Sequence, residues 1–116
     1  MATYSKIPLS GSTDGRMIAI DAIATAGTLI HTATSSATNI DEVWIYAVNS
    51  STSAVKLTLE WGGTTANTDH IELTVSGESG LVLVSPGLIL RNSLIVRAFA
   101  GTTNVINISG YVNRIS

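Results

Sequence analysis

The clearest structural signal in the chain is the octapeptide AVKLTLEW at residues 54–61, in which apolar and polar side chains alternate. Successive side chains of a β-strand point to opposite faces of a sheet, so this period of two predicts a half-buried strand. The face predicted to point into the core consists of Val55, Leu57, Leu59 and Trp61. The face predicted to point into solvent consists of Lys56, Thr58 and Glu60.

The segment that follows repeats this alternation. Residues 70–75 (HIELTV) predict a second strand, with Ile71, Leu73 and Val75 on its inner face. Residues 62–69 lie between the two strands and are rich in Gly, Thr, Asn and Asp. Such a cluster is typical of a loop, so the two strands are predicted to form a hairpin.

The neighbouring segments also read as strands. Residues 41–49 (DEVWIYAVN) are β-branched and aromatic on both faces, which indicates a central or covered strand. Residues 81–84 (LVLV) form an apolar run, and Ser85-Pro86-Gly87 is predicted to end it with a turn. The remaining strands are predicted at residues 4–9, 17–23, 28–34, 94–100 and 105–115.

Together these segments predict an all-β fold, a single antiparallel β-sandwich or jelly roll of about eight or nine short strands. No segment keeps a helical period of 3.6 residues over about a dozen positions, so little helix is expected. The 116 residues fit one domain. We assign this domain to residues 1–116, with residues 1–15 as an extended N-terminal arm.

The composition narrows the possible functions. Charged residues make up 12% of the chain against 45% hydrophobic residues, and 14 Ser and 15 Thr supply much of the polarity. Soluble monomers usually carry more charge, so this deficit favours a surface covered by copies of the chain or by a partner. The net charge of -2 argues against a nucleic acid partner. The absence of cysteine excludes disulfides and thiolate chemistry.

No segment predicts insertion into a membrane or export from the cell. Gly, Asp and Thr interrupt every apolar run before it reaches the roughly 20 residues that a spanning helix needs. Residues 16–27 are the nearest approach to a signal peptide, but Asp21 interrupts them. We therefore expect synthesis and assembly in a reducing cytoplasm, with no membrane partner.

The most enzyme-like group of side chains is Asp69, His70 and Glu72. Adjacent strand residues point to opposite faces, so Asp69 is poorly placed to orient His70 as a triad acid would. His70 and Glu72 share a face, but two ligands do not make a metal site. The group is predicted to be part of a solvated strand face, and His31 is likewise predicted to face outward. No catalytic, cofactor-binding or metal-binding residue is assigned, and no cofactor is expected.

Several short segments resemble small virion proteins of tailed phages, over about the last three quarters of the chain. These segments are DEVWIYAVN (41–49), KLTLEWGGTT (56–65), SPGL (85–88), VRAFA (96–100) and GYVNRI (110–115). The resemblance implies a β-sandwich or jelly-roll protein on the capsid surface of the virion, made in the host bacterial cytoplasm. It also implies a non-enzymatic head decoration or cement protein. Its partners would be the major capsid protein and copies of itself, with a homotrimer favoured.

The alternative is a carbohydrate-binding, lectin-like sandwich or a tail or receptor-binding module. This alternative requires Trp44, Tyr46 or Tyr111 to be exposed beside acids and amides, where their rings could stack on a sugar. The apolar neighbours of Trp44 and Trp61 favour core packing for both indoles. Trp44, Tyr46 and Tyr111 are the candidate interface residues under either hypothesis.

Overall fold

The computed structural model describes residues 2–116, and every regular element within them is a β-strand. The all-β prediction and the predicted number of strands are therefore confirmed. Among these residues no helix could cross a membrane. The nine strands are β1 (Tyr4–Pro8), β2 (Ile18–Ala19), β3 (Thr28–Thr32), β4 (Ile40–Asn49), β5 (Val55–Trp61), β6 (His70–Val75), β7 (Val82–Leu90), β8 (Ile95–Ala100) and β9 (Ile106–Ile115).

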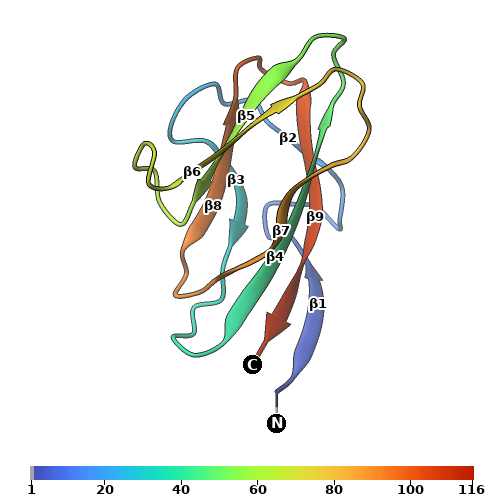
Figure 1. The fold of residues 1–116 in the computed structure, drawn as a ribbon. Coiled ribbons are helices and arrows are strands. Elements are labelled where there is room, and N and C mark those ends of the chain that lie inside the picture. The colour runs from blue at the N-terminus through green and yellow to red at the C-terminus, as the bar shows by residue number, and fades with distance from the viewer. Residues whose placement is uncertain (1) are drawn as a thin grey trace.

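The strands form two antiparallel sheets that face each other, as in a β-sandwich (Figure 1). Sheet A has five strands in the order β1-β9-β4-β7, with β2 also paired to β9, and sheet B has four in the order β3-β8-β5-β6. The two chain ends lie side by side, since Tyr4 of β1 is opposite Ile115 of β9. Residues 4–8 of the segment expected as an N-terminal arm are thus extended and belong to sheet A.

The core lies between the sheets and is built from the inner side chains of both. In β5 the predicted inner residues Val55, Leu57 and Leu59 are buried, and the predicted hairpin to β6 is present with Leu57 opposite Leu73. Trp61 is half-buried and packs against this core. The buried apolar residues are Leu9, Ile18, Ile20, Ile30, Ala33, Val43, Ile45, Ala47, Val55, Leu57, Leu59, Val75, Leu90, Val96, Ala98, Ala100, Ile106, Ile108 and Val112.

The prediction for the polar face of β5 is wrong in part. Lys56 is exposed, but Thr58 and Glu60 are buried. The segment between β2 and β3 causes the burial of Glu60, because the Gly27 N–H donates a hydrogen bond of 2.6 Å to Glu60 Oε1 and the Thr25 hydroxyl also donates to this carboxylate. A local period of two cannot show that a distant segment covers the outer face.

The turn predicted at Ser85-Pro86-Gly87 is also wrong, because β7 continues through these residues to Leu90. The strand is irregular there, with two shifts in its register against β4. Strand β7 is at the edge of sheet A, where a proline that cannot donate a backbone hydrogen bond is tolerated. Gly87 has a φ of 77°, and the Ser85 hydroxyl donates a 2.8 Å hydrogen bond to the Val43 carbonyl. In β7 the residues Ser85-Pro86-Gly87, which are typical of a turn, therefore form irregularities within a continuous strand.

Candidate functional site

The outer face of sheet A carries a pair of stacked aromatic rings. Trp44 on β4 lies directly opposite Tyr111 on β9, and their ring centroids are 6.1 Å apart with an angle of 13° between the planes. The Lys6 ammonium on β1 lies 4.3 Å from the centroid of Tyr111. A cation so close to a ring is attracted by the negative face of the π system. Three strands of the sheet are therefore linked by this stack.

The other side of Trp44 is in contact with Gly87 on β7. A Cβ atom on Gly87 would lie 3.0 Å from both Cε2 and Cζ2 of the indole and 3.2 Å from Nε1. These nearly equal distances to three adjacent ring atoms place the glycine over the ring face. The row Lys6, Tyr111, Trp44 and Gly87 thus crosses all four neighbouring strands, and we call it the cross-sheet stack.

Hydrogen bonds fix the position of Trp44 within the cross-sheet stack. The indole Nε1 donates a 2.9 Å hydrogen bond to Glu42 Oε1, and Asn113 Nδ2 donates to the same oxygen at 3.1 Å. The bond from Trp44, followed by that from Asn113, lowers the pKa of the Glu42 carboxyl, because both stabilise its ionised form. An acid and an amide therefore lie beside the two aromatic rings.

The structure places the three candidate interface residues on one surface. Tyr46 follows Trp44 on the outer face of β4 and lies between Ser109 and Leu83 of the adjacent strands. Trp44, Tyr46 and Tyr111 are all half-buried. Core packing of Trp44 is therefore a wrong prediction. The ring faces on which a sugar would stack are covered within the cross-sheet stack, so the ring edges are what the aromatic pair offers to a ligand.

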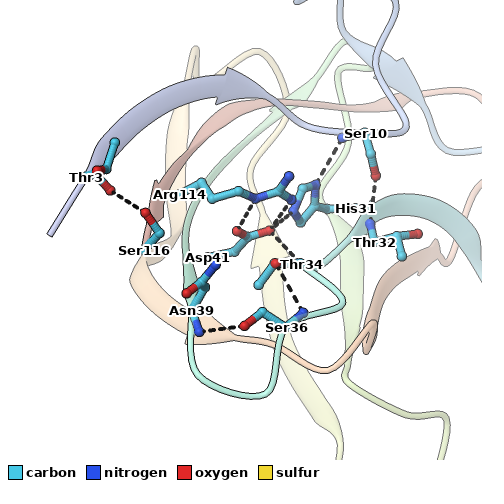
Figure 2. A network of polar contacts seen from close by, with 10 residues as sticks. All are labelled: Thr3, Ser10, His31, Thr32, Thr34, Ser36, Asn39, Asp41, Arg114 and Ser116. Carbon is cyan, nitrogen blue, oxygen red and sulfur yellow. Dashed lines mark hydrogen bonds and ion pairs between the residues drawn. The ribbon is translucent and has the colours of Figure 1, made fainter.

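A second group of polar side chains is buried at the end of the sandwich that holds the chain termini (Figure 2). Arg114 binds both carboxylate oxygens of Asp41, through Nε at 2.7 Å and Nη2 at 2.8 Å. His31 Nε2 lies 2.7 Å from Asp41 Oδ2, and the Thr34 N–H donates to that oxygen at 3.0 Å. The Ser10 N–H donates to His31 Nδ1 at 3.0 Å. Every polar atom of the imidazole and the carboxylate has a partner.

The buried position of His31 contradicts the prediction that it faces outward. His31 and Ile30 are both fully buried, although adjacent residues of a regular strand point to opposite faces. A bulge in β3 explains this, since the register against β8 shifts between Leu29 and His31. Ile30 is the extra residue, so the face of His31 is the opposite of what unbroken alternation predicts.

The electrostatics of this group favour a neutral imidazole and an ionised carboxylate. Burial is the largest effect on His31 and lowers its pKa, against the opposing contribution of Asp41. Burial also acts to raise the pKa of Asp41, but the hydrogen bonds from Arg114 and His31 outweigh it and the pKa is lowered. Because Nδ1 accepts from Ser10, the proton of the neutral ring is on Nε2 and is donated to Asp41. Both ring nitrogens of His31 are thus occupied, by the Ser10 N–H and by Asp41, so neither is free to act as a base for the Ser10 hydroxyl.

Sequence reasoning missed this group, although one signal for it was present. Asp41 alternates in phase with Val43 and Ile45, and that phase places it on the inner face of β4. A carboxylate on the inner face needs a buried cation or donors, and Arg114 has the corresponding phase on β9.

The enzyme-like group Asp69, His70 and Glu72 does not converge. The Asp69 carboxylate accepts the Thr65 N–H at 3.0 Å within the β5–β6 loop, and Glu72 forms an ion pair with Lys56. The His70 ring lies edge-on to Phe99, with centroids 5.8 Å apart, and its Nε2 is buried without a hydrogen-bond partner. Across residues 2–116, no three His, Asp or Glu side chains are grouped so that they could hold a metal ion.

Exposed apolar side chains gather along one edge of sheet A. Five of the nine large apolar residues that are exposed lie within residues 81–94. They follow edge strand β7 and the turn after it, and we call them the β7 strip: Leu81, Leu83, Leu88, Ile89 and Leu94. Leu83 and Ile89 pair with Tyr46 and Glu42 of the outer face of β4, whereas Leu88 pairs with Val43 of its inner face, so the strip follows both sides of this edge. Exposed apolar side chains gathered in this way are typical of a protein-binding site.

Two pockets lie at the Leu94 end of the β7 strip. The larger, of about 330 Å³, is mainly apolar and is lined by Ile40, Ile89, Leu90, Arg91, Asn92 and Leu94. The smaller, of about 230 Å³, is lined by Gly62, Gly63, Thr64, Ser93, Leu94, Ile95 and Arg97. Both pockets share Leu94, and each has an arginine in its wall.

Comparisons of the chain with models of protein families, with curated proteins and with solved structures find no match. The class of the protein is therefore given by its fold, an all-β chain with two antiparallel sheets packed as a sandwich.

Proposed function

We propose that this protein is a non-enzymatic structural subunit of a virion, a decoration or cement protein that binds and stabilises the head of a tailed phage. Its partners are the major capsid protein and copies of itself, and it acts on the capsid surface. The observation that carries this proposal is the β7 strip, an exposed apolar surface in a chain of low charge. Burying such a surface against a partner is favourable by about 25 cal/mol per Å² of apolar area.

The backbone of β7 supports contact through side chains rather than through an added strand. Pro86 lies in the middle of the strand and the register against β4 shifts twice, so the edge is neither straight nor complete in hydrogen-bond donors. Prolines and bulges of this kind prevent the edge strand of a sheet from forming a hydrogen-bonded ladder with a strand of another molecule. A specific contact of standard size, about 1,600 Å², would therefore form over the side chains of the strip.

The state of the titratable groups is consistent with a structural role. His31 and Asp41 are fully buried and bonded within the network of Figure 2, and Glu60 is buried beneath the segment that carries Thr25 and Gly27. These groups stabilise the sandwich itself. A cement subunit needs buried area across the joints between shell subunits, and no proton transfer takes part.

The test is sedimentation of the purified protein with phage heads assembled without it. The double variant Leu83→Asp, Ile89→Asp places two charges on the outer face of the β7 strip and should bind heads at least tenfold more weakly, a change of about 1.4 kcal/mol. The matched control is Ile23→Asp, since Ile23 is 65% exposed and lies outside the strip. Wild-type protein that does not sediment with heads, or a double variant that binds as well as the control, would contradict the proposal.

A second candidate function is a carbohydrate-binding or receptor-binding module. The observation in its favour is that Glu42 and Asn113 lie beside Trp44 and Tyr111. The observation against it is that the cross-sheet stack covers the faces of both rings. Titration with glucose, galactose, mannose and N-acetylglucosamine, followed by tryptophan fluorescence, tests it. A saturable change that Tyr111→Ala removes would support this function, and an unchanged signal with all four sugars would exclude these ligands.

A further inference from the structure

We infer that copies of this chain join head to tail, with the Glu78–Leu81 turn of one copy seated in the larger pocket beside Leu94 and Arg91 of the next. This inference rests on the proposed function, because it specifies how the subunit contacts copies of itself. It depends on the difference between the two ends of β7, where one end carries an acid and an exposed leucine and the other carries an apolar pocket and an arginine.

The two surfaces lie at opposite ends of one strand. Val82 at the start of β7 pairs with Ala47, whereas Leu90 at its end pairs with Asp41 near the start of β4. Their partners Ala47 and Asp41 are six residue steps of about 3.3 Å apart on β4, so the two ends of β7 are roughly 20 Å apart. Figure 1 shows the connection from β6 to β7 and the turn from β7 to β8 at opposite ends of the sandwich.

The first surface is a fixed turn that presents an acid and a leucine. Glu78 and Gly80 have φ angles of 52° and 76°, and the Glu78 N–H donates to the Asn49 carbonyl at 3.0 Å. The Ser79 hydroxyl donates to the Ser76 carbonyl at 2.8 Å and closes the turn. Leu81 is 61% exposed just beyond it. A rigid turn loses little conformational entropy when it binds, which favours it as an inserted element.

The second surface is an apolar pocket beside a cation. Its volume of about 330 Å³ is large enough for an aliphatic side chain, since an enclosed cavity of about 150 Å³ can take up benzene. Arg91 lies in its wall and is exposed. The turn that carries the pocket is also fixed, because the Ser93 N–H donates to the Thr34 carbonyl at 2.8 Å and the Asn92 N–H donates to the Ser36 carbonyl at 3.2 Å.

The charges of the two surfaces are complementary and are not used within the chain. Among residues 2–116, four charged side chains have no ion pair, side-chain hydrogen bond or aromatic contact: Asp14, Arg16, Glu78 and Arg91. Asp14 and Arg16 lie in one loop, two residues apart. Glu78 and Arg91 lie at opposite ends of β7, beside the two ends of the apolar strip. Glu78 and Arg91 therefore each lack an ion-pair partner within the chain, and a second copy of the chain can supply it.

The arrangement also determines the symmetry of the contact. In the proposed contact the turn of one copy meets the pocket of the next, so Glu78 faces Arg91 and the remaining end of each copy stays free for a further copy. A contact between unlike surfaces is heterologous, and it closes into a ring or extends into a filament. A homotrimer is one ring that such a contact can form.

The experiment is analytical ultracentrifugation of the full chain with charges reversed at either end. Glu78→Arg and Arg91→Glu should each raise the dissociation constant for self-association at least tenfold, with unchanged circular dichroism and melting temperature. Asp14→Arg is the matched control, because it reverses an exposed acid with no partner at another site, and it should associate as the wild type does. An equimolar mixture of Glu78→Arg and Arg91→Glu should associate again into assemblies in which the two variants alternate, since each variant then meets an end of opposite charge.

The outcomes separate this inference from the proposed function. Single variants that associate like the wild type, or a mixture that associates no better than its components, would overturn the head-to-tail contact. Wild-type protein that stays monomeric but sediments with heads would also overturn it and leave the proposed function standing. Wild-type protein that self-associates through these ends but does not bind heads would support the contact and contradict the proposed function.

Discussion

Arg114 and Asp41 face each other across β9 and β4, and the guanidinium binds both oxygens of a carboxylate that is fully buried. The bidentate geometry offsets part of the cost of removing Asp41 from water. Because His31 and Thr34 donate to the same carboxylate, strands β3, β4 and β9 all depend on this one anion. Strands of both sheets are thus joined at the end where the termini lie.

Removing the cation should therefore destabilise the sandwich. We expect Arg114→Met to lower the free energy of unfolding by about 3 kcal/mol, because a buried carboxylate is left without its cation while the partly exposed position lets some water in. The control is Lys56→Met, which breaks an exposed ion pair with Glu72 and should cost less than about 0.5 kcal/mol. Urea denaturation measures both. Equal losses would show that Asp41 does not need Arg114.

The stability of the protein should fall as the pH is lowered below neutrality. The pKa of folded His31 is depressed, so the unfolded chain takes up its proton first, from about pH 6.5 downward. The contribution of His31 is therefore present above this pH and is lost as the pH falls through the folded pKa, with a slope of up to about 1.4 kcal/mol per pH unit. Protonation at Nδ1 would also remove the acceptor for the Ser10 N–H.

Asp41 adds a second loss at lower pH, since its folded pKa is also depressed and its contribution disappears as the pH falls below about 4. Urea denaturation of wild type and His31→Gln between pH 7.5 and 5 separates the two residues. The variant should show a much flatter dependence in that range, because glutamine does not titrate. An identical pH dependence in both proteins would assign the effect to other groups.

The contact between Gly87 and Trp44 gives a prediction with a closely matched control. Gly87 and Gly80 have nearly the same φ, 77° and 76°, but a Cβ on Gly87 would lie 3.0 Å from the indole whereas a Cβ on Gly80 would meet nothing within 4 Å. We expect Gly80→Ala to cost about 1 kcal/mol from backbone strain alone. Gly87→Ala should cost about 1 to 3 kcal/mol more, because the ring must move within a packed row.

Tryptophan fluorescence gives a second measurement of this contact. Displacement of the indole from Gly87 would also disturb its hydrogen bond to Glu42, so Gly87→Ala should shift the emission of the folded protein. Gly80→Ala should leave the emission unchanged. The same stability and the same spectrum in both variants would mean that the cross-sheet stack does not position Trp44.

Core substitutions should distinguish the two strands of the β5–β6 hairpin. Leu59 is fully buried, and Leu59→Ala should cost about 2 to 5 kcal/mol. Leu73 is half-buried on edge strand β6, so Leu73→Ala should cost about 1 to 2 kcal/mol, since less area is lost from the core. Urea denaturation shows which of the two variants loses more stability. A larger loss of stability in Leu73→Ala would indicate that β6 contributes more to the core than the exposure of Leu73 suggests.

The parts of the fold that follow from local alternation could be predicted from the sequence. The hairpin of β5 and β6 is an example, because the phase of Leu57 and Leu59 persists over the whole strand without a bulge. Asn, Ser and Gly clusters between strands also marked most of the turns. These features need information from only a few neighbouring residues.

The parts that failed depend on irregularities or on distant segments. The bulge at Ile30 reverses the face of His31, and no residue type in that segment signals it. Glu60 is buried because Gly27, more than thirty residues earlier, lies over it. Pro86 indicates a turn in most contexts and a bulge at the edge of a sheet, and sequence alone does not say which strand is at the edge. The candidate interface residues Trp44, Tyr46 and Tyr111 lie on one face of sheet A, and the sequence indicates this only for Trp44 and Tyr46, which share a phase on β4.

The two ends of the described chain lie close enough to be joined by a short linker. Thr3 and Ser116 exchange two backbone hydrogen bonds of 2.9 Å, so β1 and β9 are positioned as the two arms of a hairpin that has no connecting loop. A linker of a few residues would supply that loop, and the break could then be moved to the exposed residues 64–68 between β5 and β6. A circularly permuted chain of this kind would carry its new ends in the β5–β6 loop, and a fluorescent label or a fused domain could be attached there.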